Sequence, residues 1–239
     1  MTTCKNCSTD VFQNYCANCG QPAKLKRIDG HYIAHELEHL LHVERGIVYT
    51  IKELLIRPGE TIRHFISEDR SRLVKPVIFI IITSLIYTIA IKVFHVHDGI
   101  IQFDEKERSA TGAIFGWIVG NYGYSNILWG AFIAAWAKLF FRKYNYNFYE
   151  ILILLCFVQG MVMLLFSVFL IFQELTHIHV QKLEGSIGLL YFSWAVGQFF
   201  DQKKPLSYLK AFASYMLGTL TFLLLAILIG AAIDMVIKY

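Results

Sequence analysis

The segment FYEILILLCFVQGMVMLLFSVFLIF, residues Phe148–Phe172, has only two strongly polar side chains, Glu150 at its leading edge and Gln159. As an α-helix it would extend about 38 Å, which exceeds the roughly 30 Å of hydrocarbon in a bilayer. A soluble chain of 239 residues has no core that needs so long a helix apolar on every face. Lipid does need one, because backbone groups there must pair within the segment. The segment therefore predicts a transmembrane helix.

The composition of the whole chain agrees with a membrane protein. Hydrophobic residues make up 56% of the chain, charged residues 17%, and the mean hydropathy is +0.48, whereas soluble domains average about 25% charged residues. The sequence contains no dinucleotide fingerprint, phosphate-binding loop or nucleophile elbow. We expect no nucleic-acid partner and no activity of those enzyme classes.

Further apolar runs predict a bundle of about five transmembrane helices. The other four are Pro76–Val93, Tyr124–Phe141, Leu183–Phe200 and Ala211–Val236. We interpret Ser109–Gly120, which precedes a break at NYGYSN (121–126), as an interfacial or re-entrant helix. Its Gly112, Gly116 and Gly120 form a small-residue strip that predicts close approach of another helix. The expected fold class is thus an all-α polytopic membrane bundle over residues 76–239.

The basic residues predict the orientation of that bundle. Eleven lysines and arginines precede Pro76, and the predicted inner loops at Arg142–Lys143 and Lys203–Lys204 are also basic. The predicted outer loop Phe94–Ser109 carries a net charge of minus two. The positive-inside rule then places the amino terminus in the cytosol and the carboxyl terminus outside. No signal peptide precedes the first cysteines. We expect a multi-pass protein of a bacterial cytoplasmic (inner) membrane.

The first 24 residues predict a small zinc ribbon. Cys4, Cys7, Cys16 and Cys19 follow the pattern C-x2-C-x8-C-x2-C, in which two tight turns can close a tetrahedral site for structural zinc. Two disulfides or a rubredoxin-like iron site are the alternatives. Gly20 is expected to take the left-handed backbone of such a turn. Phe12 and Tyr15 offer almost the only core, so the metal would supply most of the folding energy.

Residues 25–75 predict cytosolic amphipathic and basic connector helices. The segment HYIAHELEHLLH places His31, His35, His39 and His42 on one helix face and leucines on the other, which is typical of an interfacial helix. HELEH also matches the H-E-x-x-H motif, where His35 and His39 would bind zinc and Glu36 would act as the base. The segment is palindromic and equally fits H-x-x-E-H. Surface histidines, an accessory metal or pH-sensing site, and a metalloprotease site remain the three interpretations.

The rest of the connector is predicted as short helices broken at Pro58 and Gly59, with Thr50 capping a helix that starts near Ile51. Its basic residues, Arg57, Arg63, Arg70, Arg72 and Lys75, are expected to attract anionic lipid headgroups and to fix the orientation.

Several of these motifs together resemble a known family. They are Cys19-Gly20-Gln21 after the cysteine pattern, then HELEHLLH, then RGIVYTIKELLIRPGETIR (45–63), then Arg70 and Arg72 ahead of Lys75 and Pro76. The sequence is similar to an uncharacterised bacterial family with a zinc ribbon ahead of a multi-span membrane domain. The resemblance implies a zinc head and a membrane body, and it implies no activity.

Three functions follow as hypotheses. We favour a non-enzymatic membrane adaptor, scaffold or sensor, in which the cytosolic head binds a protein partner and the chain contacts membrane lipids or a second copy of itself. The second is a transporter or lipid-handling protein, for which a path lined by Gln159, Asn121, Asn126 or Gln198 would argue. The third is a membrane metalloprotease that uses His35, Glu36 and His39.

Overall fold

The computed structural model describes residues 2–12, 14–20, 22, 29–30, 46–94, 109–178 and 181–237. Apart from a small head, where strand β1 (Thr2–Thr3) pairs antiparallel with strand β2 (Asp10–Val11), its regular elements are helices. The α-helices of the described chain are α2 (Ile47–Ile56), α3 (Pro58–Ser67), α4 (Pro76–Phe94), α5 (Ala110–Gly120), α6 (Tyr122–Phe140), α7 (Phe148–Thr176), α8 (Gln181–Asp201) and α9 (Pro205–Ile237). The predicted all-α fold with a cysteine-bearing head is confirmed.

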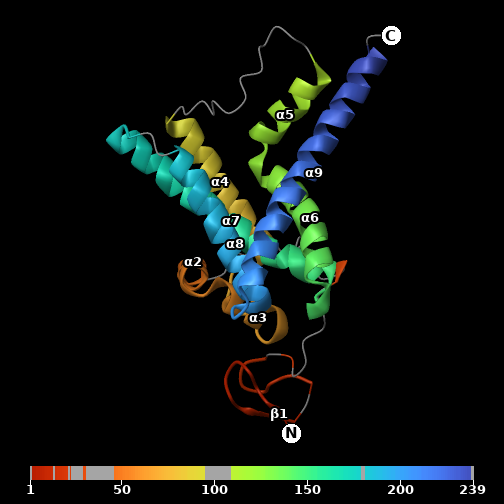
Figure 1. The fold of residues 1–239 in the computed structure, drawn as a ribbon. Coiled ribbons are helices and arrows are strands. Elements are labelled where there is room, and N and C mark those ends of the chain that lie inside the picture. The colour runs from red at the N-terminus through yellow and green to blue at the C-terminus, as the bar shows by residue number, and fades with distance from the viewer. Residues whose placement is uncertain are drawn as a thin grey trace.

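The arrangement of these elements is simple. Figure 1 shows the head and the helices α2 and α3 at one end of a bundle of long helices, with the carboxyl terminus at the other end. We call α2, α3 and the turn that leads to α4 the connector. A 3-10 helix at Arg142–Tyr144 makes the turn between α6 and α7.

Three of the described helices, α4, α7 and α9, are long and apolar enough to cross a membrane. Helices α4 and α7 begin at the residues predicted from hydropathy, and α7 continues to Thr176. Helix α9 begins at Pro205, earlier than predicted. Helices α6 and α8, with 19 and 21 residues, are as long as α4 but less apolar, and α5 is a shorter apolar helix. These helices fit an integral membrane protein.

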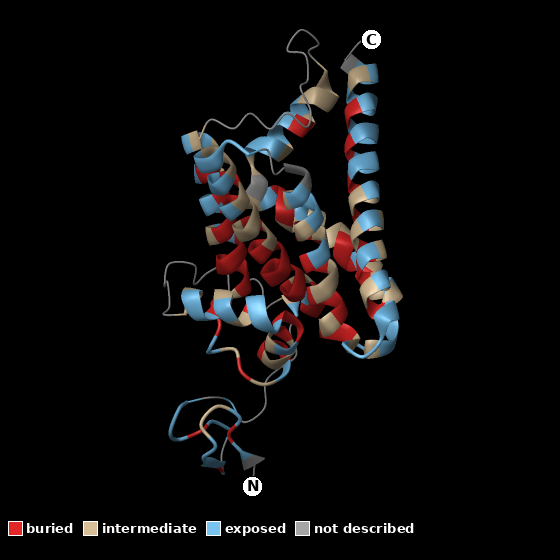
Figure 2. Cartoon of the chain, turned by 60° about the vertical axis from the view of Figure 1, so that its left-hand side comes forward, coloured by how far each residue is buried: buried red, intermediate tan, exposed pale blue. Residues whose placement is uncertain are grey.

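Helix α7 is the centre of the bundle and contacts α4, α6 and α8. In the most apolar stretch of α7, 72% of the residues are buried inside the protein, whereas the corresponding fraction for α9 is 17%. Its start is fixed by a capping box, because the Asn147 side chain accepts from the Glu150 N–H at 2.8 Å and the Glu150 carboxylate accepts from the Asn147 N–H at 2.7 Å. Figure 2 shows the buried residues gathered in the part of the bundle nearer the connector.

The connector and the membrane helices share one hydrophobic core. Leu54 of α2 and Phe65 of α3 belong to the same buried cluster as Phe79 of α4 and Phe157 of α7. The ring of Phe157 lies 5.2 Å from that of Phe65 and 5.8 Å from that of Phe79, measured between centroids. The connector is therefore a packed part of the bundle and not a flexible tether.

Glycines bring the bundle helices into close contact. A Cβ added at Gly160 of α7 would lie 2.7 Å from the Phe79 ring of α4, and one at Gly218 of α9 would lie 2.7 Å from the Cα of Ile133 in α6. Contacts through small residues are usual between membrane helices, because lipid provides no hydrophobic drive for helix association and close van der Waals packing must replace it.

Helix α5 packs against α9 near the carboxyl-terminal end of α9. Asp234 accepts a hydrogen bond of 2.6 Å from the first N–H group of α5, which places a carboxylate at the positive end of that helix. One turn back, a Cβ added at Gly230 would lie 2.4 Å from the Thr111 hydroxyl. A Cβ added at Gly116 or Gly120 would meet no atom of the described residues within 4 Å, so no described helix makes the predicted close approach at these two glycines.

The amino-terminal end of α3 is fastened to the carboxyl-terminal end of α8. The Gly59 N–H donates to the Gln198 side chain at 2.8 Å, and a Cβ on Gly59 would lie 2.3 Å from the Phe199 nitrogen. The Arg63 guanidinium donates to the main-chain carbonyls of Gln198 and Phe199. The last carbonyls of a helix lack intrahelical partners, so Arg63 caps α8 and complements its dipole.

The start of α2 differs from its prediction. The helix begins at Ile47, after Gly46 with a φ of 152°, and Thr50 lies inside it. The buried Thr50 hydroxyl accepts a hydrogen bond of 3.0 Å from the N–H of Val74, so it ties α2 to the segment before α4 and does not cap a helix.

Candidate metal centre

The four amino-terminal cysteines converge in the head. Their Sγ atoms all lie within 4.8 Å of one another, and Cys4 faces Cys19 as Cys7 faces Cys16, each pair at 3.5 Å. Thiolates around tetrahedral zinc, with Zn–S bonds of about 2.3 Å, would lie roughly 3.8 Å apart. A disulfide requires about 2.05 Å, and none of the four cysteines is disulfide-bonded. The cluster can hold a metal ion, and the disulfide alternative is not formed.

Each C-x-x-C pair lies on a tight turn. The Ser8 N–H donates to the Cys4 carbonyl at 2.9 Å, and the Gly20 N–H donates to the Cys16 carbonyl at 2.8 Å. Gly20 has a φ of +72°, as predicted for the position after the second pair, and Ser8 takes the corresponding place after the first pair with a φ of +59°. Backbone hydrogen bonds therefore direct both thiols of each pair toward one point.

The surroundings of Cys7 and Cys4 favour their thiolates. The Thr9 hydroxyl, 3.3 Å from the Cys7 Sγ, and the Thr9 backbone amide lower the pKa of Cys7 to about 5. The backbone amides of Cys7 and then Asn6 lower the pKa of Cys4. Because the thiolate is the form that binds metal, Cys7 is ready for a cation at neutral pH and loses that charge only as the pH falls toward 5.

The head is attached to the connector through its first cysteine turn. Arg72 donates to the backbone carbonyl of Asn6 at 3.0 Å, and its guanidinium also lies 3.1 Å from the Asp69 carboxylate. The Lys5 ammonium lies 3.5 Å from Glu68. Asp69 is buried, and it also accepts from the N–H and hydroxyl of the residue two positions on. One arginine thus joins the metal-binding turn to a buried carboxylate of the connector.

The two aromatic residues of the head do not form its core. Phe12 is 73% exposed and Tyr15 is 63% exposed, whereas Cys4, Val11 and Cys16 make up the buried cluster of the head. The expectation that these rings pack inside is wrong. The ribbon is too small to enclose them once the sulfur atoms occupy its centre.

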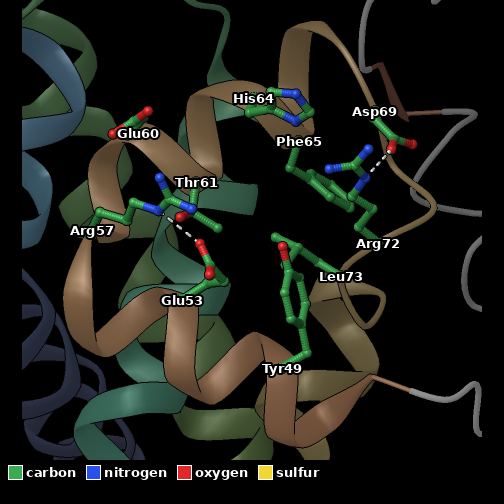
Figure 3. A pocket seen from close by; sticks show the side chains of 10 residues that line it. All are labelled: Tyr49, Glu53, Arg57, Glu60, Thr61, His64, Phe65, Asp69, Arg72 and Leu73. Atoms are coloured by element: carbon green, nitrogen blue, oxygen red, sulfur yellow. Dashed lines mark hydrogen bonds and ion pairs between the residues drawn. The ribbon is translucent and has the colours of Figure 1, made fainter. Parts of the chain in front are cut away.

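A polar cavity of about 170 Å³ lies between α2, α3 and the turn before α4. Figure 3 shows two ion pairs among its lining residues, Arg57 with Glu53 and Arg72 with Asp69. The Arg57 Nε lies 2.8 Å from the Glu53 carboxylate, and this contact raises the pKa of Arg57. Because each guanidinium already has a carboxylate partner, the cavity offers no free charge of either arginine to a ligand.

The four connector arginines that were expected to attract headgroups each have a protein partner. Arg57 pairs with Glu53, Arg63 caps α8, Arg70 donates to the Ile66 carbonyl at 3.1 Å, and Arg72 bridges the head. The sequence did not reveal these contacts, because the positive-inside rule counts every basic residue near a membrane in the same way, whether it contacts lipid or protein.

The other candidate residues are distributed as follows. His35, Glu36 and His39, with His31 and His42, lie outside the described residues. Among the polar residues predicted for a substrate path, Gln198 is engaged with Gly59, and Asn121 lines a cavity beside α4. Asn126 and Gln159 are buried, and neither amide nitrogen has a hydrogen-bond partner in the described structure. The hydrogen bond expected from the Gln159 amide group to a neighbouring helix is not made by its nitrogen.

Part of the chain matches a known family. Residues 44–88, which comprise α2, α3 and the first part of α4, match the model of a family described as a protein of unknown function (DUF3667). The predicted resemblance is confirmed for this part of the chain. No curated protein and no solved structure matches the chain.

Proposed function

We propose that the protein is a non-enzymatic membrane adaptor whose zinc-bound head recruits a cytosolic protein to the bilayer. The observation that carries the proposal is the pair of exposed rings, Phe12 and Tyr15, on a head that Arg72 attaches to the connector. Large aromatic side chains supply much of the energy of protein interfaces, and a small module gains nothing from exposing them to water.

Structural zinc is the metal that fits this head best. Four cysteine sulfurs are available, which is the ligand set of closed structural zinc sites and leaves no position for a substrate. A closed site stabilises a fold without acting on a substrate, which supports an adaptor over an enzyme. The ribbon would then be a rigid platform for the two rings.

Alanine at both Phe12 and Tyr15 is expected to abolish binding of the partner. Loss of two central aromatic residues typically weakens an interface by about tenfold or more for each residue. A photo-crosslinking amino acid at position 12 identifies the partner, and titration of the purified partner against wild-type and variant protein measures the affinity. Asn14→Ala, an exposed change between the two rings, serves as the control.

The zinc content of the double variant should stay at the wild-type value, because neither ring contributes to the buried cluster of the head. Wild-type affinity in the double variant, or an equal loss in Asn14→Ala, would remove the basis for the proposal.

We place the head in the cytosol and count five crossings, by α4, α6, α7, α8 and α9. Support comes from the turns near Arg142 and Lys203, which meet each other beside the connector. There, the rings of Phe141 and Phe200 stack at 3.8 Å, and Arg63 caps α8. Basic turns at the end that carries the head satisfy the positive-inside rule, and an odd number of crossings agrees with termini at opposite ends of the bundle in Figure 1.

Fusion reporters test this orientation. A fluorescent protein that folds only in the cytosol should be bright at the amino terminus and dark at the carboxyl terminus, and alkaline phosphatase, active only outside, should give the opposite result. Equal phosphatase activity at the two termini would exclude an odd number of crossings.

A further inference from the structure

Helices α4, α5 and α6 surround a cavity of about 500 Å³ in the membrane part, within the range of about 300–1,000 Å³ that is common for small-molecule sites. Much of its lining is aliphatic, with Val77, Ile81 and Leu85 from α4 and Ile127 from α6. Ile81 is 38% exposed and Leu85 56% exposed, so the cavity continues into the outer face of a helix that is apolar enough to cross a membrane. Such a face is covered by acyl chains, and the cavity opens to lipid.

One polar group in the lining has no protein partner. Ser84 of α4 is 2% exposed, lines the cavity, and its hydroxyl makes no hydrogen bond within the described structure. It lies opposite Gly123 of α6, where an added Cβ would come 3.7 Å from the Ser84 Cβ. An unpaired hydroxyl in hydrocarbon costs free energy, so a ligand that can hydrogen-bond to it would be stabilised.

Two more groups of this kind, one on α6 and one on α7, lie outside the lining of the cavity. Asn126 lies one turn beyond Gly123, and Gly130 one turn further, where the side chain of Gln159 from α7 approaches. The amide nitrogens of Asn126 and Gln159 are buried without partners in the described structure. Among the described residues that line the cavity, the Ser84 hydroxyl is the buried donor without a partner, so the site suits a ligand with an acceptor atom.

The surroundings narrow the class of ligand. The described residues that line the cavity carry no charge, and Ser84 lies about 12 Å along α4 from Pro76, well inside the hydrocarbon. A phosphate group would not reach that depth without a cation, because a buried unpaired charge is costly. The aliphatic walls suit a flexible chain better than a planar ring. The ligand should combine an acyl chain with an uncharged carbonyl.

We propose that the cavity between α4 and the α5–α6 junction binds a diacylglycerol, with an acyl chain against the aliphatic wall and an ester carbonyl accepting a hydrogen bond from the Ser84 hydroxyl. This site is independent of the head and of the adaptor role. It gives the membrane part a lipid ligand of its own.

Photolabelling tests the site. Full-length protein in vesicles of phosphatidylethanolamine and phosphatidylglycerol is exposed to a diacylglycerol that carries a diazirine in one acyl chain. Label should appear in peptides from α4 and the start of α6, and unlabelled diacylglycerol should compete it away. Ser84→Ala removes only the hydroxyl and should weaken binding about two- to tenfold, the usual effect of losing one hydrogen bond.

Gly123→Leu fills the cavity and should reduce the label at least as much as Ser84→Ala, whereas Gly116→Leu, at an open glycine of α5, should not reduce it. Three results would overturn the proposal: label spread equally to α9, wild-type labelling of Ser84→Ala, or competition by added phosphatidylglycerol as effective as that by diacylglycerol. The last result would identify the ligand as a phospholipid. Because Ser84→Ala leaves the packing nearly unchanged, it decides the question even if Gly123→Leu fails to fold.

Discussion

Full-length protein with serine at both Cys4 and Cys16 is expected to hold no zinc, while the wild-type protein holds one ion per chain. The double change removes one ligand from each cysteine turn and leaves two of the four sulfurs. Binding of structural zinc contributes about 10–16 kcal/mol in small zinc modules, and among the described residues of the head only Cys4, Val11 and Cys16 form its buried cluster. The head should therefore unfold and become sensitive to protease.

The membrane part should survive this change, because its large buried cluster contains no head residue. Metal analysis of the purified protein, together with limited proteolysis, measures both effects. Cys156→Ser is the matched control, since it makes the same replacement at the fifth cysteine and should retain zinc. His35→Ala with His39→Ala should also retain it. Zinc that persists in the Cys4 and Cys16 variant, or disappears with the histidines, would shift the site to HELEH and revive the metalloprotease hypothesis.

Gly59→Ala is expected to destabilise the membrane part by about 3 kcal/mol, the upper end of the usual cost of overpacking. The added Cβ would lie 2.3 Å from the Phe199 nitrogen, and a backbone atom cannot move aside as a flexible side chain can. The shift would also disturb the contact of Arg63 with the end of α8. In detergent, the thermal midpoint should fall by roughly 6–12 °C.

Gly116→Ala is the control for this experiment, because it makes the same replacement inside another helix where a Cβ meets nothing within 4 Å. It should leave the midpoint unchanged or raise it, since alanine favours the helix by about 1 kcal/mol over glycine. A midpoint for Gly59→Ala equal to that of wild type would show that α3 and α8 are further apart than the structure places them.

Hydropathy predicted the starts of α4 and α7 because it measures how readily a segment transfers from water to lipid, and both helices are strongly apolar. The apolar runs from Pro76 and from Phe148 became α4 and α7 with the predicted starts. The start of α9 was placed too late because Ser207 and Lys210 in its first two turns are polar, although Ser207 is buried. A polar residue that is buried by other parts of the protein lowers the hydropathy of its segment, because a hydropathy scale measures transfer to lipid and does not include protein contacts.

The cysteine cluster was predictable because its spacing alone fixes its geometry, whereas the anchoring contacts were not. Arg63 meets residues more than 130 positions away, and Arg72 meets Asn6 across 66 positions. Neither contact leaves a local pattern in the sequence. Thr50 shows the same limit, since a hydroxyl that suited a helix cap was used for a tertiary bond to Val74.

The docking of α5 on α9 imposes an order on biosynthesis. The carboxylate that receives the first N–H of α5 belongs to Asp234, 124 residues further along the chain, so α5 must wait at the bilayer until Asp234 has been synthesised. A nascent chain that stops before Gly230 lacks the part of α9 that α5 contacts. In such truncated products the first N–H of α5 lacks its carboxylate partner, and we expect membrane proteases to degrade them faster than the longer chain.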